Sequence, residues 1–145
     1  MKILLQRVAY AVVRVNGEEI ARIGKGILAL VGIEEGDAPE TADHLAEKTA
    51  LLRIFPDDAG KMNLSCLDIG GEILAVSQFT LAGNCSKGRR PSFDKAAHPD
   101  SARTLYERYI KKIEACGIAT ASGRFAADMK IELLNDGPVT FLLEK

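Results

Sequence analysis

Apolar residues gather into short runs that are separated by turn-forming residues. The first run, residues 3–15, is rich in Val, Ile and Leu, and Asn16-Gly17 separates it from a second strand-like run over residues 18–23. Asn-Gly between two such runs is the strongest short signal for a β-hairpin, because both turn residues adopt a positive φ. Residues 26–33 form a continuous apolar run, which predicts a buried central strand.

Two segments have the periodicity of amphipathic helices. Pro39 opens a predicted helix that runs to about Arg53, and Pro99 opens another that runs to about Cys116. A proline in the first helical turn costs no hydrogen bond, because the N–H that it lacks has no acceptor there. The predicted inner faces are formed by Ala42, Leu45, Ala46, Thr49 and Leu52 in the first helix and by Ala102, Leu105, Tyr109, Ile113 and Cys116 in the second.

Four further apolar runs, at residues 73–76, 118–122, 129–133 and 139–143, predict strands, and residues 135–138 predict a turn between the last two. Many strands, two long helices and short connections favour an α/β fold with two β-sheets, mixed and barrel-like, and both helices packed on one side. A chain of 145 residues corresponds to a single domain, residues 1–145.

The composition is typical of a globular protein, with 47% hydrophobic and 27% charged residues. No apolar run approaches the length of a membrane span, so no membrane partner is expected. The chain reaches Gln6 and Arg7 too early for the apolar part of a signal peptide. We therefore expect a cytoplasmic protein.

Cysteine and histidine are few and widely spaced, which predicts neither a disulfide framework nor a metal site, and we expect no cofactor. They are Cys66, Cys85, Cys116, His44 and His98. The formal net charge of −1 argues against broad, non-specific binding of nucleic acid. A local basic cluster is present at Lys87, Arg89, Arg90 and Lys95, and a solvated charge cluster is its more common explanation.

The segment Ser77-Gln78-Phe79-Thr80 is the first candidate site. It places two hydroxyls and an amide at the end of the apolar run 73–76, and scaffolds commonly present chemistry at such a strand end. By pattern alone, hydroxyls that hydrogen-bond within their own turn are the more common explanation. Gly137-Pro138 is the second candidate, and its residue types alone favour a trans peptide bond.

Several motifs in this order resemble the D-aminoacyl-tRNA deacylase family, first known for hydrolysing D-tyrosyl-tRNA, and the resemblance runs from end to end. The motifs are Gln6-Arg7-Val8, Gly60-Lys61-Met62-Asn63, Ser77-Gln78-Phe79-Thr80, Lys87-Gly88-Arg89-Arg90-Pro91-Ser92-Phe93, Ala127-Asp128-Met129 and Asn135-Asp136-Gly137-Pro138-Val139-Thr140. The chain departs from the family's usual pattern at residues 82–86. It also departs at Ala126, a position where glycine is more usual in the family.

The resemblance implies a homodimer with active sites at the interface and a role in chiral proofreading during translation. Ser77, Gln78 and Thr80 would line the pocket for the 3′ end of an aminoacyl-tRNA, with Met129 near the pocket wall. Gly137 and Pro138, joined by a cis bond, would reach into the partner's pocket and exclude L side chains, and Arg7 would brace them across the interface. Glycine has no side chain to exclude, so glycyl-tRNA is an expected second substrate.

The implied reaction is hydrolysis of the ester between an amino acid and a ribose hydroxyl. The backbone N–H groups of Phe79 and Thr80 are candidate donors to the oxyanion, and one such donor is worth about 10²–10³ in rate. Thr80 as a covalent nucleophile would need an adjacent base, and neither histidine belongs to a motif. Attack by water assisted by the substrate's 2′-OH, with Thr80 as a positioning group, is therefore preferred.

Two other functions fit the same fold. A nucleic-acid-binding module without hydrolysis would use the basic cluster at residues 87–95, although the near-zero net charge weighs against it. An editing domain that removes L-serine from tRNA is disfavoured by Gly137-Pro138, because a wall against L side chains would exclude that substrate.

Overall fold

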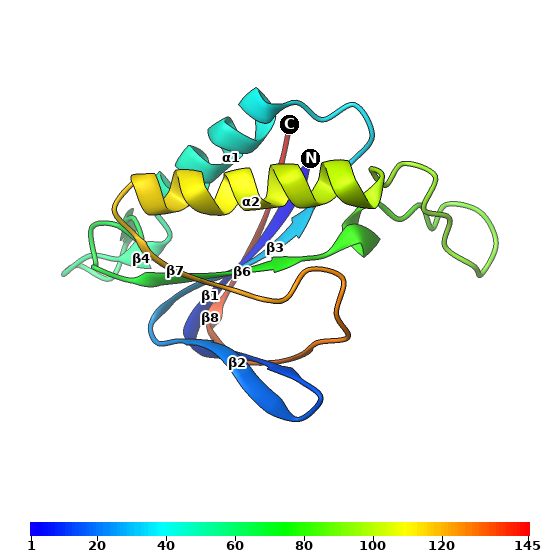
Figure 1. The fold of residues 1–145 in the computed structure, drawn as a ribbon. Helices are drawn as coiled ribbons and strands as arrows, with labels where there is room; N and C mark the ends of the chain where they lie inside the picture. Colours follow the sequence, from blue (N-terminus) through cyan, green and yellow to red (C-terminus); the bar gives the residue numbers. More distant parts are fainter.

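In the computed structural model, which describes residues 1–145, a curved β-sheet carries both long helices on one face (Figure 1). The elements in chain order are β1 (Lys2–Val15), β2 (Glu18–Ile23), β3 (Gly26–Gly32), α1 (Pro39–Leu51), β4 (Phe55–Pro56), β5 (Met62–Leu64), β6 (Glu72–Ser77), the 3₁₀ helix η1 (Phe79–Ala82), α2 (Pro99–Ala115), β7 (Ala119–Ser122) and β8 (Lys130–Glu144).

The main sheet has six strands and is mixed. Its order is β2-β1-β3-β6-β7, with β8 paired to the other edge of β1. Strand β1 pairs antiparallel with β2, β3 and β8, whereas β3–β6 and β6–β7 are parallel pairs. Strands β4 and β5 form a separate two-stranded sheet. The predicted fold class, an α/β fold with two sheets and two helices packed on one side, is therefore confirmed.

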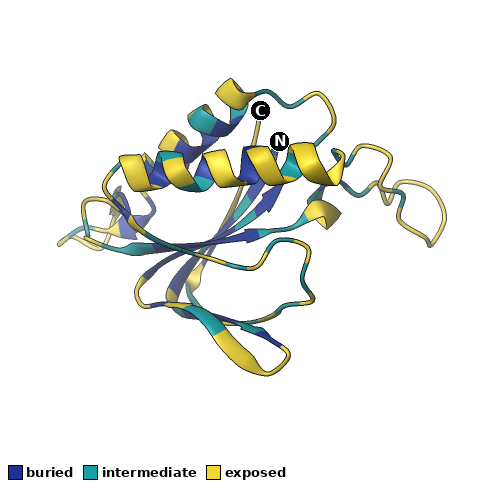
Figure 2. Ribbon diagram, in the orientation of Figure 1, coloured by how far each residue is buried: buried dark blue, intermediate teal, exposed yellow.

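Each face of the main sheet covers its own apolar core. The larger core lies between the sheet and the two helices, where the inner faces of α1 and α2 are buried (Figure 2). Within it the Tyr109 hydroxyl donates a 2.9 Å hydrogen bond to Thr49 Oγ1, which joins α2 to α1. The smaller core lies where the sheet curls over on itself and contains Val8, Ala11, Val13, Ile23, Leu28, Leu74 and Val76.

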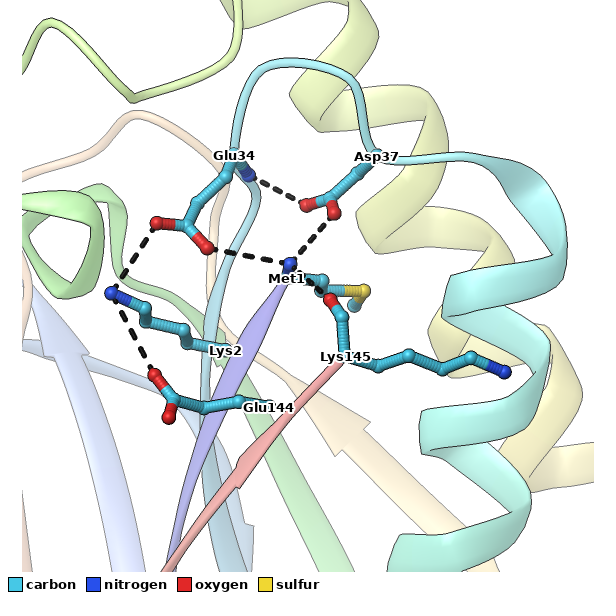
Figure 3. Close-up of polar contacts among 6 residues, drawn as sticks. All are labelled: Met1, Lys2, Glu34, Asp37, Glu144 and Lys145. Carbon is cyan, nitrogen blue, oxygen red and sulfur yellow. Dashed lines mark hydrogen bonds and ion pairs between the residues drawn. The ribbon is translucent and has the colours of Figure 1, made fainter.

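The two chain ends are held together beside the start of α1 (Figure 3). The Met1 ammonium donates to Asp37 Oδ1 at 2.6 Å, to the Lys145 carbonyl at 2.9 Å and to Glu34 Oε2 at 3.4 Å. Lys2 links Glu34 to Glu144 by two further ion pairs. These contacts fix the first residue of the sheet, its last strand and the β3–α1 loop relative to one another.

The predicted hairpin is confirmed, with φ of 52° at Asn16 and 82° at Gly17. The predicted chain reversal at residues 135–138 is wrong, because β8 continues through these residues as one strand. Both halves of β8 pair with β1, so residues 136–139 form a bulge between the paired residues Asn135 and Thr140. Residues 79–82 form the helix η1. None of the helices is both long and apolar enough to cross a membrane.

Candidate active site

A cavity of about 380 Å³ lies between the end of β6, the first turns of α2 and the β7–β8 connection. Nine of its twelve lining residues are hydrophobic, so it suits a ligand with an apolar body. The lining residues are Val31, Ile33, Ser77, Gln78, Phe79, Ala96, Ala97, Pro99, Ala102, Tyr106, Phe125 and Ala126. Three of the predicted site residues, Ser77, Gln78 and Phe79, therefore share one cavity.

Parallel pairing with β3 sets the position of the Ser77–Thr80 segment. The last paired residues are Val31 and Ser77, and the Gln78 N–H donates to the Val31 carbonyl at 2.7 Å. The chain then enters η1, which packs directly over Gly32. A Cβ at Gly32 would lie 2.8 Å from Leu81 Cβ, so only glycine permits this close approach. The end of β6 is therefore held close to the sheet.

The backbone N–H groups of Phe79 and Thr80 have no acceptor in the chain. They are the first N–H groups of η1, which have no partner within the helix. No side chain caps η1, and no turn or loop carbonyl accepts from either group. Two adjacent donors are thus available, one at Phe79, which lines the cavity, and one at Thr80, which is exposed and does not line it. The Gln78 side-chain amide donates to the Thr80 hydroxyl oxygen, which fixes the orientation of both side chains.

Aromatic side chains form two walls of the cavity. The Phe79 ring is 59% exposed and packs edge-on against Phe93, with 5.0 Å between ring centroids. Phe125, which also lines the cavity, has its ring centroid 5.9 Å from that of Tyr106, and the Arg103 guanidinium lies 5.1 Å from the Phe125 centroid. Arg103 thereby supports Phe125 by a cation–π contact.

Tyr106 is a buried structural donor. Its hydroxyl donates to the Ala75 carbonyl at 2.9 Å, and burial raises the pKa of this phenol far above its ordinary value. The phenol therefore stays protonated and cannot act as a base at neutral pH. No Asp, Glu, His or Lys lines the cavity, which leaves it without a general base from the protein.

The cavity wall includes a turn with an unusual backbone. The Ala127 N–H donates to the Arg124 carbonyl at 3.2 Å, so Phe125 and Ala126 are the central residues of a β-turn. Ala126 has φ of 62°, a value that favours glycine at the third turn position. Both central residues line the cavity. Non-glycine residues with a positive φ are concentrated at functional sites.

Gly137 and Pro138 lie elsewhere in the chain, on the β8 bulge, and the bond between them is cis. Arg7 is the residue of β1 that faces this bulge. Its Nε donates to the Asp136 carbonyl at 3.0 Å, and its Nη1 donates to the Ile54 carbonyl at 2.6 Å. The guanidinium thus braces the bulge from within the same chain, whereas the resemblance implied a brace across an interface.

The predicted site residues therefore fall into two groups within one chain. Strands β1 and β3 lie between β8, which carries Gly137 and Pro138, and β6, which leads to Ser77. Met129 does not line the cavity. It is partly buried and packs against the smaller core, and a Cβ on Gly123 would lie 2.7 Å from its Sδ.

Sequence reasoning missed the roles of α2 and of Phe125 in the cavity. Pro99, Ala102 and Tyr106 line it from the first two turns of α2, at helical spacing of three and four residues. That spacing is visible in the sequence, but it reads equally well as core packing. No group of three or more His, Cys, Asp or Glu side chains is arranged to hold a metal ion.

Known proteins resemble this chain over its whole length. The profile of the family described as D-Tyr-tRNA(Tyr) deacylase matches residues 4–144. A D-aminoacyl-tRNA deacylase of Pelobacter propionicus is 59% identical over 145 residues, which are 100% of both chains. One of Geobacter sulfurreducens is 60% identical over 144 residues, 99% of this chain and 95% of its own.

Two solved structures share the fold. A protein described as c-Myc DNA Unwinding Element Binding Protein superposes with a TM-score of 0.94 at 38% identity, over 100% of this chain and 99% of its own. A probable eukaryotic D-amino acid tRNA deacylase superposes with a TM-score of 0.84 at 18% identity, over 98% of this chain and 97% of its own. Taken with the family profile and the identities near 60%, these matches establish that the chain belongs to the D-aminoacyl-tRNA deacylase family of hydrolases.

Proposed function

We propose that this chain hydrolyses the ester bond of D-aminoacyl-tRNA and releases free tRNA and the D-amino acid. The observation that carries the proposal is the pairing of an apolar, aromatic-walled cavity with two unused backbone N–H groups at Phe79 and Thr80. The names of relatives about 60% identical support the same substrate class. Such a role in translation places the enzyme in the cytoplasm.

The cavity suits the 3′-terminal nucleoside of the tRNA. Proteins bind unpaired bases by stacking them on aromatic side chains, and Phe79 and Phe125 both line the cavity. The small side chains of Ala96, Ala97 and Ala102 leave space within it. A nucleoside seated there brings its ribose, and the ester that the ribose carries, toward the end of β6.

The two free N–H groups are placed to stabilise the oxyanion. During ester hydrolysis the carbonyl oxygen gains negative charge, and one preorganised donor is worth about 10²–10³ in rate. Phe79 and Thr80 would supply two donors from consecutive residues. An aminoacyl ester is already activated, so this stabilisation supplies a large part of the required rate.

Water, assisted by the substrate's own 2′-OH, is the attacking group that we favour. A covalent role for Thr80 requires a base next to its hydroxyl. The neighbour that contacts this hydroxyl is the Gln78 amide, which donates a hydrogen bond and cannot accept the proton. The arrangement therefore suits a positioning role for Thr80 and Gln78.

A second copy of the chain would complete the site. Gly137 and Pro138 cannot reach the cavity of their own chain, because β1 and β3 lie between the two motifs. Strand β8 also exposes three large apolar side chains, Leu134 at 53%, Phe141 at 40% and Leu142 at 51%. Large apolar side chains exposed on a strand at the edge of the sheet favour an interface with another chain. A two-fold dimer through β8 would bury them and bring each bulge to the partner.

The bulge would then act as the chiral filter. An apolar pocket separates close analogues by only about 1–3 kcal/mol, which is too little to spare the abundant L-aminoacyl-tRNA. A rigid main-chain wall excludes an L side chain by steric overlap. Arg7 would hold that wall through the Asp136 carbonyl. Glycyl-tRNA would escape the filter and be a second substrate, because glycine has no side chain.

Binding of nucleic acid without hydrolysis is the second candidate function. It is favoured by the likeness to the DNA unwinding element binding protein, at 38% identity, and by the basic residues 87–95. Because the net charge is only −1, we expect the chain to contact a nucleic acid at one local site and not along its whole length.

The test is deacylation of one tRNA charged with D-tyrosine, L-tyrosine or glycine, in the presence of a chelator. We expect rapid loss of the D-tyrosyl and glycyl esters, with the L-tyrosyl ester intact. Equal loss of both tyrosyl esters would refute the filter. Binding of tRNA without hydrolysis of any ester would favour the second candidate.

The dimer is tested separately by sedimentation of Leu142→Glu, with Leu51→Glu as the control because Leu51 is equally exposed, at 56%, on α1. We expect only Leu142→Glu to sediment as a monomer and to lose discrimination between D and L esters. Two variants with the same sedimentation as the parent would exclude an interface through β8.

A further inference from the structure

Most of the basic side chains make no ion pair, and some of these unpaired cations lie near the cavity. Seven of the nineteen Lys and Arg side chains have a carboxylate partner within 4.0 Å, and they lie mainly on the sheet and on the outer faces of the helices. The cations beside the cavity have none. They include Lys87, Arg89 and Arg90, in the loop that leads to Phe93, and Arg103 and Arg124, which lie next to Phe125.

The first three cations lie at the tip of an exposed loop, residues 84–92, which we call the basic loop. Reciprocal backbone hydrogen bonds of 2.8 and 3.1 Å between Asn84 and Ser92 close its base. Phe93 then anchors it to the cavity wall by packing on Phe79. Figure 1 shows the loop projecting beside the first turn of α2. The charges are thus carried outward from a fixed base.

No acidic side chain neutralises the basic loop. Asp94 is the one acidic residue between residues 83 and 99, and it makes no ion pair. The side chains of Lys87, Arg89 and Arg90 make no hydrogen bond within the chain and are exposed. Clustered cations without internal partners raise the local positive potential even where the net charge is near zero.

We propose that the basic loop binds the phosphate backbone of the RNA strand whose 3′ end enters the cavity. This inference rests on the proposed function, because a terminal nucleoside in the cavity forces the preceding phosphates across its rim. Arg103, which lies over the Phe125 ring, and Arg124, which precedes Phe125 in the chain, meet the same backbone nearer to the cavity. Phosphate contacts of this kind set affinity and register and carry no base sequence.

Binding of uncharged tRNA against salt concentration measures this surface without any need for hydrolysis. The variant is Lys87→Ala, Arg89→Ala and Arg90→Ala together. Each lost phosphate contact reduces the steepness of log affinity against log salt by roughly 0.7–0.9, so three lost contacts reduce it by about 2–3. The affinity ratio between parent and variant is then roughly 20–40-fold larger at 50 mM than at 200 mM salt.

A matched control removes the same charge elsewhere. Lys48, Lys61 and Lys111 are exposed, have no carboxylate partner and lie on α1, the β4–β5 turn and α2. We expect Lys48→Ala, Lys61→Ala and Lys111→Ala together to leave the salt slope within experimental error of the parent. An equal fall of the salt slope in both triple variants would mean that tRNA binding depends on the net charge and not on the position of the cations. This result would overturn the proposal.

A second readout separates this inference from the proposed function. The substrate is D-tyrosyl-adenosine, which carries the ester but no preceding phosphates. The basic-loop variant is expected to raise KM about tenfold for D-tyrosyl-tRNA, with kcat and all constants for D-tyrosyl-adenosine unchanged. An unchanged KM for the tRNA would overturn the proposal and leave the hydrolase intact. Absence of hydrolysis by the parent would refute the proposed function. The salt dependence of tRNA binding would still decide whether the basic loop binds the phosphate backbone.

Discussion

Gly137→Ala tests the contact between the β8 bulge and Arg7. Gly137 has φ of +126°, where an L side chain is strained by about 1–3 kcal/mol. Its Cβ would lie 2.7 Å from Arg7 Nη2 and 2.8 Å from Val139 Cγ2. Because Arg7 is only 8% exposed and held by two backbone carbonyls, it can move away only by giving up a hydrogen bond.

A hydrogen bond from a charged group is worth about 1.5–3 kcal/mol, so the whole substitution is expected to cost about 3–5 kcal/mol of unfolding free energy. This corresponds to a fall in Tm of roughly 10 °C for a domain of this length. The control is Gly36→Ala. Gly36 has φ of +86° but no atom within 4 Å of its Cβ, so only the backbone cost of about 1 kcal/mol remains.

The measurement is urea unfolding followed by far-ultraviolet circular dichroism, because the chain has no tryptophan, at one fixed protein concentration. Arg7→Met completes a double-mutant cycle with Gly137→Ala, since it removes the atom nearest to the new methyl. We expect a coupling energy of at least about 1 kcal/mol. Strictly additive costs, or a Gly137→Ala variant as stable as Gly36→Ala, would refute the reasoning.

Three further predictions concern other parts of the molecule. Ala126→Gly removes the strain of a positive φ from the cavity wall. We expect Tm to stay unchanged or to rise by about 2 °C, and KM for the ester to rise. A fall in Tm would contradict this prediction. Tyr109→Phe leaves Thr49 Oγ1 without its buried donor and is expected to cost about 1–2 kcal/mol in the same unfolding assay. Burial, with Glu72 nearby, raises the pKa of the Cys66 thiol from 9.0 to about 12. Above pH 9 the unfolded thiol loses its proton while the folded one keeps it, so stability falls as pH rises from about 9 to about 12, and Cys66→Ala should flatten this part of the pH profile.

Local pattern was sufficient wherever the signal lies in neighbouring residues. The hairpin at Asn16-Gly17 follows from the positive φ that both residues accept, and the two helices follow from apolar spacing after Pro39 and Pro99. The order of motifs around Ser77–Thr80 and Gly137–Pro138 was sufficient to indicate the family. Each turn, helix and single motif among these features is decided by residues that are near one another in the chain.

Pairing between distant segments decided the rest. Residues 135–138 have the composition of a turn, but both flanking halves find partners on β1, so the chain continues and the extra residues form a bulge opposite Arg7. The cavity wall at Phe125 likewise depends on the packing of α2 across the end of β6. Ser77, at that end of β6, precedes Phe125 by about fifty residues in the chain. Strand pairing and helix packing join residues with no local relation, because their hydrogen bonds and buried area exist only once the sheet has formed. The sequence by itself therefore determined the elements and the motif residues, while tertiary structure alone brought Ser77, Tyr106 and Phe125 to one cavity and kept Gly137 away from it.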